Sequence, residues 1–94
     1  MSVARITTLN FKSKDGADQV EETYKNNAPT EFAEAEQLIE VRVNDTTLMF
    51  VSLYADNDAM ERASAARSKR MDLNKDLIES MDGNTGNIIL NHTN

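Results

Sequence analysis

The sequence feature that most constrains the fold is a strand-like segment with no polar face. Residues 47–54 alternate between two mainly apolar sets of side chains: Leu48, Phe50, Ser52 and Tyr54 in one set, and Met49, Val51 and Leu53 in the other. A strand directs successive side chains to opposite faces of its sheet, so both faces of this segment favour burial. Two helices in a chain of 94 residues can cover one face of a small sheet. We therefore expect a second copy of the same chain to cover the other face.

Length and composition limit the class of protein. A chain of this length forms one domain, residues 1–94, with a single modest core. Hydrophobic residues make up 39% and charged residues 28% of the chain, which argues against a disordered tail. No run approaches the roughly 18 apolar residues that a membrane-spanning helix needs. The first residues lack a basic region followed by an apolar segment, so we expect no secretory leader.

The net charge of −6 limits the expected partners. Binding to a phosphate backbone depends on Lys and Arg, so we expect no nucleic-acid partner, and no anionic membrane surface for the same reason. The chain has no cysteine, which excludes disulfides, zinc–thiolate sites and a thiol nucleophile. These features fit a cytoplasmic, bacterial protein.

The predicted order of elements is β-α-β-β-α-β. Apolar periodicity indicates strands at residues 3–12, 36–44, 47–54 and 87–92, and helices at residues 17–27 and 57–81. Asp15 is the candidate cap of the first helix, Pro29 ends it, and residues 56–58 offer caps for the second helix. This order predicts a ferredoxin-like α+β sandwich, with both helices on one face of a four-stranded antiparallel sheet.

Two such sheets packed face to face form a dimeric α+β barrel. The apolar residues expected at this homodimer interface are Ile6, Met49, Val51, Leu53 and Ile89. Burial of this face predicts an interface above roughly 1,200 Å². Apolar residues alternate with Glu40 and Arg42 in residues 36–44, which places that strand at an edge of the sheet.

Arg67 interrupts the apolar stripe of the second predicted helix. The stripe consists of Met60, Ala63, Met71, Ile78 and Met81. Arg67 falls inside this stripe, and Asn74 lies beside it. The guanidinium either enters a cavity and binds an anionic group, or reaches water or an acidic side chain while its stem packs on the core. The sequence leaves both interpretations open.

The apolar side chains between sheet and helices provide a candidate ligand-binding cavity. Its candidate ligand-binding residues are Leu9, Phe11, Tyr24, Phe50, Tyr54, Met60, Arg67 and Met71, with Val20, Leu48 and Ile78 completing the lining. Methionine adapts to irregular ligands, and the chain has no tryptophan to stack on a flat ring. We therefore expect an acyl-chain-like ligand, whose carboxylate or carbonyl group is held by Arg67 with Tyr24 or Tyr54.

Other chemistry has little support in the sequence. His92, the single histidine, lies two residues from the end of the chain, and the scattered carboxylates form no metal-ligand pattern. The three glycines are not spaced as a phosphate-binding loop or a dinucleotide fingerprint. We therefore predict no cofactor and no metal, and we assign no catalytic residue.

Two segments resemble the dimeric α+β barrel superfamily, and within it the antibiotic-biosynthesis-monooxygenase type. Residues 10–16 are similar to the family's strand followed by Lys-x-Gly, and residues 53–60 to its strand end, aromatic residue, acidic cap and helix start. The resemblance implies a pocket between sheet and helices, where family members oxidise polycyclic aromatics without a cofactor or bind and degrade haem. Tyr54 stands where the family often has tryptophan, and Ala63 where it often has histidine. The resemblance therefore implies no proximal haem ligand here, and Asn10 lies one residue out of register with the family's first-strand asparagine.

Three functions are compatible with these features. The first is a homodimer that binds a small apolar or amphipathic ligand, and the second is a cofactor-independent monooxygenase or isomerase that uses the same cavity. The third is a structural or regulatory dimer whose core is filled. RNA-recognition domains share the topology, but residues 46–49 lack the basic residue, glycine and aromatic residues of their third-strand motif, and the chain is acidic. An open apolar cavity beside Arg67 would favour the first two functions over the third.

Overall fold

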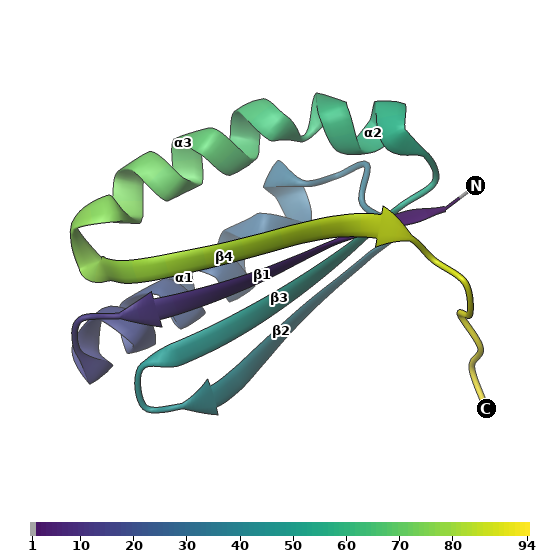
Figure 1. Cartoon of the computed structure of the whole chain (residues 1–94). Coiled ribbons are helices and arrows are strands. Elements are labelled where there is room, and N and C mark those ends of the chain that lie inside the picture. The colour runs from purple at the N-terminus through teal and green to yellow at the C-terminus, as the bar shows by residue number, and fades with distance from the viewer. Residues whose placement is uncertain (1) are drawn as a thin grey trace.

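The computed structural model describes residues 2–94. Its elements along the chain are β1 (Val3–Phe11), α1 (Lys14–Glu31), β2 (Gln37–Asn44), β3 (Thr47–Tyr54), α2 (Asn57–Arg62), α3 (Ser64–Asn74), the 3-10 helix η1 (Lys75–Leu77) and β4 (Ile78–Asn87). The strands form one antiparallel sheet in the order β2-β3-β1-β4, and the helices lie on one of its faces (Figure 1). This is the predicted ferredoxin-like α+β sandwich, and the edge position predicted for β2 is confirmed.

The register of the strands determines which side chains face the helices. In the pairing of β1 with β3, Thr7 lies opposite Phe50, and Ile6 lies opposite Val51. Thr7 and Phe50 are buried beneath the helices, whereas Ile6 is 42% exposed. Side chains alternate along a strand, so Ile6 and Val51 belong to the side of the sheet away from the helices, which we call the outer face.

The hydrophobic core fills the space between the sheet and the first two helices. Its buried members are Val3, Leu9, Phe11, Ala17, Val20, Tyr24, Ala28, Phe32, Leu48, Phe50, Tyr54, Ala59, Met60 and Ala63. In contrast, none of the residues of α3 is fully buried. The second helical layer therefore packs tightly on the sheet at α2 and more loosely along α3.

The first helix is longer than predicted at both ends. It begins at Lys14, because Ser13 rather than Asp15 is its N-cap and accepts a hydrogen bond of 3.1 Å from the backbone N–H of Gly16. Pro29 does not end the helix but lies inside its last turn. A proline there removes a single hydrogen bond, and the buried Ala28 and Phe32 fix that turn against the core.

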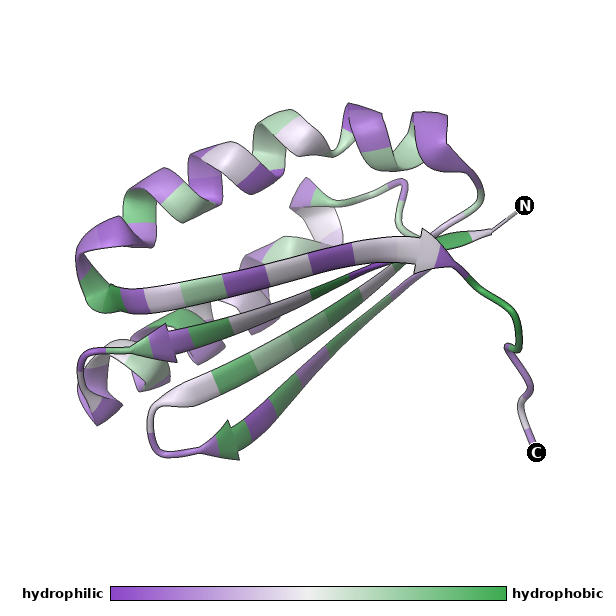
Figure 2. Cartoon of the chain, in the orientation of Figure 1, coloured by the Kyte–Doolittle hydropathy of each residue, from purple (hydrophilic) through white to green (hydrophobic). Residues whose placement is uncertain are grey.

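The predicted helix at residues 57–81 and the predicted strand at residues 87–92 are wrong. The helix divides at Ala63 into α2 and α3 and ends at Asn74, although Asp56 is its N-cap as expected. Ile78 and Met81 therefore belong to β4, which pairs with β1 from Phe11↔Ile78 to Val3↔Asn87. The free edge of β1 explains the difference, because backbone pairing with it outweighs the weak strand propensity of residues 82–86. Figure 2 shows β4 as the least hydrophobic strand of the sheet.

The outer face presents an unpaired apolar surface over β2, β3 and the middle of β1. Its apolar side chains are Ile6, Ile39, Val41, Val43, Met49 and Val51, and four of them are at least 37% exposed.

Residues 88–94 run away from α2 and α3 beyond the end of β4 (Figure 1) and expose Ile89 and Leu90. Within residues 2–94, every helix is too short or too polar to cross a lipid bilayer.

Candidate functional site

A cavity lies between the helix-facing side of the sheet and helices α1 and α3. Its lining consists of Arg5, Thr7, Leu9, Val20, Tyr24, Phe32, Phe50, Ser52, Tyr54, Arg67, Arg70, Met71 and Asn74. The interior volume is about 40 Å³, and the cavity is not sealed from solvent. This space holds roughly three water molecules without any movement of the walls.

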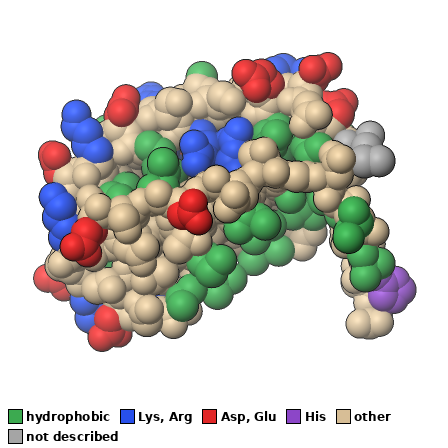
Figure 3. Space-filling model, in the orientation of Figure 1, with side chains coloured by type: hydrophobic (Ala, Val, Ile, Leu, Met, Phe, Trp, Pro, Cys, Tyr) green, Lys and Arg blue, Asp and Glu red, His purple; other side chains and the backbone are tan. Residues whose placement is uncertain are grey.

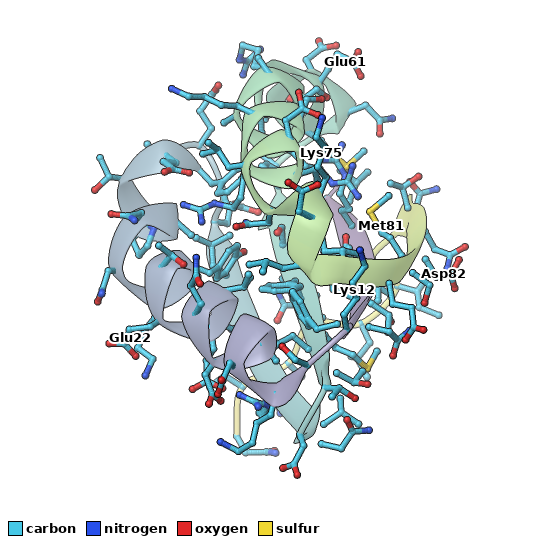
Figure 4. All side chains as sticks on the ribbon, turned by 90° about the vertical axis from the view of Figure 1, so that its left-hand side faces the viewer. Lys12, Glu22, Glu61, Lys75, Met81 and Asp82 are labelled. Atoms are coloured by element: carbon cyan, nitrogen blue, oxygen red, sulfur yellow. The ribbon has the colours of Figure 1, made fainter. Side chains whose placement is uncertain are left out.

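The cavity lies where α3 packs less closely on the sheet than α2 does. The stripe that faces the sheet runs from Met60 and Ala63 in the tightly packed part to Arg67, Met71 and Asn74 in α3. These last three side chains are only half-buried, so the helix does not seal the sheet beneath it. Viewed end-on (Figure 4), α1 and α3 lie next to each other over the sheet, with Met81 and Asp82 marking the β4 edge.

The structure brings together most of the residues predicted from the sequence. Six of the eight candidate ligand-binding residues line the cavity: Leu9, Tyr24, Phe50, Tyr54, Arg67 and Met71. Phe11 and Met60 are buried in the core outside the lining, because each packs where the helical layer already closes on the sheet. Of the additional lining residues, Val20 is placed correctly, whereas Leu48 lies in the core and Ile78 in β4. The ligand-binding role of all these residues stays a prediction.

An aromatic wall closes the α1 side of the cavity. The ring of Tyr24 packs edge-on against Phe50 with 4.6 Å between centroids, and lies 6.3 Å from the ring of Phe32. Burial raises the pKa of Tyr24 above its ordinary value of 10.0, so its hydroxyl is protonated at neutral pH. Tyr24 can therefore donate a hydrogen bond into the cavity, and it is a poor general base.

Arg70 covers this wall from the α3 side. Its guanidinium lies 5.6 Å from the centroid of the Tyr24 ring and donates to Glu31 of α1, with 2.7 Å between Nη2 and Oε2. The ion pair holds α3 against α1 and neutralises the charge of Arg70. Only 11% of the Arg70 side chain is exposed, so this residue belongs to the contact between α3 and α1.

Arg67 extends from α3 toward β1 and β4. Its Nη2 donates a long hydrogen bond of 3.5 Å to the hydroxyl of buried Thr7. The guanidinium passes close to Gly83 of β4, because a Cβ atom built on that glycine would lie 3.4 Å from Nη2, at van der Waals contact. Burial lowers the pKa of Arg67, and the positive charge of Arg5 lowers it further. Figure 3 shows basic side chains gathered at the centre of the molecule, between α3 and β4.

Arg5 and Ser52 are polar lining residues that were not predicted from the sequence as site residues. The sequence pattern could have identified Arg5, because Arg5 lies on the same face of β1 as Val3, Leu9 and Phe11, which face the helices. The β1–β3 register places Arg5 directly opposite Ser52, which brings both into the cavity. Asn74, which the helical stripe placed beside Arg67, also lines the cavity.

Comparisons with known proteins identify the fold. No protein-family profile matches the chain. No curated protein matches its sequence. A dimeric ferredoxin-like protein from an uncultured marine organism superposes with a TM-score of 0.80 and 10% identity over 99% of this chain and 92% of its own.

Two further structures are named for oxygenase chemistry. A candidate antibiotic biosynthesis monooxygenase from Chloroflexus aurantiacus has a TM-score of 0.79 and 5% identity over 99% of this chain and 98% of its own. SnoaB, a cofactor-independent oxygenase from Streptomyces nogalater, has a TM-score of 0.67 and 14% identity over 96% of this chain and 95% of its own. At these identities the likeness establishes the fold alone. The chain thus has the ferredoxin-like α+β fold shared by dimeric proteins and by proteins of the antibiotic-biosynthesis-monooxygenase type.

Proposed function

We propose that this chain forms a homodimer and that each subunit binds a small amphipathic ligand in the cavity beneath α3. The apolar part of the ligand contacts Leu9, Phe50 and Met71, and its polar group is oriented by Arg67. The ligand class is an acyl-chain-like carboxylate or carbonyl compound. Binding, rather than catalysis, is the activity that the side chains of the cavity support best.

The observation that carries this proposal is a half-buried guanidinium in an aromatic and aliphatic cavity. The guanidinium of Arg67 has no carboxylate partner within residues 2–94, and its single hydrogen bond to these residues is the 3.5 Å bond to Thr7. A half-buried arginine without an ionic partner loses part of its hydration, and a group that accepts its hydrogen bonds offsets this cost. A ligand that enters the cavity would supply that group.

The volume of the cavity favours a short ligand. A space of about 40 Å³ admits a carboxylate or carbonyl group and little else, so a ligand as long as hexanoate enters only when a wall moves. Met71 is the adaptable part of the wall, because its thioether side chain has three rotatable bonds and is only half-buried. Because the cavity is on the helix side of the sheet, pairing through the outer face would leave it accessible in both subunits.

The proposed dimer is supported by two independent observations. The outer face exposes a contiguous set of apolar residues, of which Val41 is 45% and Val43 50% exposed. Apolar patches of this kind are typical of protein–protein interfaces. In addition, the marine ferredoxin-like structure that superposes on this chain is described as dimeric.

Isothermal titration calorimetry with hexanoate tests the proposed site. Wild-type protein is expected to bind one hexanoate per subunit, and Arg67→Met, which keeps an apolar stem, is expected to weaken binding about tenfold. Lys69→Met is the matched control, because it removes a charge from the exposed face of the same helix. Equal affinities of Arg67→Met and wild-type protein would show that Arg67 is not the anchor.

A cofactor-independent oxygenase is the second candidate, favoured by the oxygenase names of two structural neighbours. Tyr54 is the residue to test, because it lines the cavity and is 1% exposed. If this candidate is correct, the protein consumes oxygen with a quinol substrate, and Tyr54→Phe abolishes the consumption. A structural dimer with a filled core is the least favoured candidate, because an open cavity lies beside Arg67.

A further inference from the structure

The arginines of this chain differ in how their charges are compensated. Arg42 forms ion pairs with Asp18 and Glu21, Arg62 with Glu34, and Arg70 with Glu31. Arg5 and Arg67 form no ion pair within residues 2–94. Both uncompensated arginines line the cavity.

The absence of a carboxylate at these two arginines is informative because the chain is rich in acids. It has 16 Asp and Glu residues against 10 Lys and Arg, yet none of the acidic residues lines the cavity. The unliganded cavity thus holds two positive charges in an apolar setting. The two groups are close enough for the charge of Arg5 to lower the pKa of Arg67. Like charges at close range destabilise the empty cavity, and an anion between them removes that repulsion.

We propose that Arg5 and Arg67 form a two-arginine clamp that makes the cavity selective for organic anions over neutral ligands of the same shape. This inference rests on the proposed function and specifies its ligand: the polar group is a carboxylate or a similar planar anion, and a neutral carbonyl does not suffice. Two guanidinium forks can bind both oxygens of one carboxylate through charge-assisted hydrogen bonds.

The surroundings of the two guanidiniums fit an anion. Thr7, Ser52 and Asn74 supply neutral polar groups to the lining, so no negative charge competes with the ligand. Arg70 also lines the cavity, but Glu31 already compensates its charge. Arg5 comes from the rigid central strand β1, whereas Arg67 comes from the half-buried α3. The sheet thus fixes one side of the clamp, and the more loosely packed helix provides the other.

The decisive experiment compares hexanoate with hexanamide, which has nearly the same shape and no charge. By calorimetry at low ionic strength, wild-type protein is expected to bind hexanoate at least about tenfold more tightly than hexanamide. Arg5→Met is expected to weaken hexanoate binding about tenfold and to leave hexanamide binding unchanged. Lys12→Met, just beyond the end of the same strand, is the matched control and should change neither affinity.

The outcomes separate the clamp from the proposed function. If wild-type protein binds both ligands equally, the clamp is wrong and ligand binding stands; if it binds neither, the proposed function itself fails. A loss of both affinities in Arg5→Met would mean that Arg5 only supports the fold.

Thermal melting of the protein without ligand provides a second measurement. If the clamp is correct, Arg5→Met has a higher melting temperature than wild-type protein, because one of two repelling charges is gone. If Arg5 is purely structural, Arg5→Met has a lower melting temperature. The wild-type comparison needs no variant, so it remains decisive even if Arg5→Met does not fold.

Discussion

Glu40 shows how a single side chain makes stability depend on pH. Its Oε2 atom is buried and has no hydrogen-bond partner within residues 2–94. Burial, together with the nearby charges of Glu21 and Glu22, raises the pKa of Glu40 from 4.5 to about 7, against the smaller opposing effect of Lys25 and Arg70. Between pH 4.5 and 7 the folded protein therefore binds more protons at this site than the unfolded chain. The contribution of Glu40 to stability falls as the pH rises through this window.

Glu40→Gln should abolish this pH dependence. At pH 8 the variant is expected to be more stable than wild-type protein by about 1 kcal/mol, a value reduced from the full pKa shift because water screens a half-buried carboxylate. At pH 4 the two proteins should differ much less, because Glu40 is mostly protonated in both the folded and the unfolded state. Urea denaturation at both pH values measures the difference, with Glu61→Gln as an exposed control. A destabilised variant at pH 8 would mean that ionised Glu40 has a partner that compensates its charge.

Among the structural elements, the strands show what the sequence can and cannot predict. Strand β3 coincides with its predicted range of residues 47–54, because a mainly apolar run between polar turns leaves few alternatives. The fourth strand was placed too late in the chain, at residues 87–92, because the Asp, Asn, Thr and Gly of residues 82–86 have the composition of a turn. Its conformation is imposed by hydrogen bonding to β1, which no local pattern in the sequence reveals.

The same limit applies to the candidate site. Helical periodicity placed Arg67, Met71 and Asn74 on the face that lines the cavity, because spacing along a helix fixes which residues share a face. Periodicity does not determine how far a helix lies from the sheet, so it could not separate the cavity residue Met71 from the core residue Met60. Arg5 could have been found from the alternation of β1, but its approach to Arg67 depends on tertiary packing.

The two glycines of β4 provide a matched test of the position of the Arg67 guanidinium in the clamp. A side chain on Gly83 would contact Arg67, whereas no atom lies within 4 Å of a Cβ built on Gly86. Gly83→Val is expected to displace the Arg67 guanidinium and to weaken hexanoate binding several-fold, while Gly86→Val should leave the affinity unchanged. Valine favours strands, so neither variant should lose β4. Equal hexanoate affinities of the two variants by calorimetry would contradict the position assigned to Arg67.

For the whole molecule, the outer face predicts self-association. Val51 lies on β3 between Ile6 of β1 and Ile39 of β2, in the middle of the apolar surface. Val51→Lys places a charge there and is expected to convert a dimer into a monomer, because an unpaired buried charge is costly at an interface. Sedimentation velocity at micromolar concentration measures the change. Leu73→Lys is the control, because Leu73 is 75% exposed on α3, on the opposite side of the sheet. A monomeric wild-type protein, or a dimeric Val51→Lys, would exclude association through this face.

The most direct test of the central claim, that the cavity beneath α3 binds a small organic anion, is a hexanoate titration of protein carrying 13C-labelled methionine methyl groups. Met71 lines the cavity, whereas Met49 lies on the outer face. Hexanoate is expected to shift the Met71 methyl signal to saturation and to leave the Met49 signal in place. An unchanged Met71 signal, or equal shifts at Met71, Met49 and the exposed Met81, would contradict binding in this cavity.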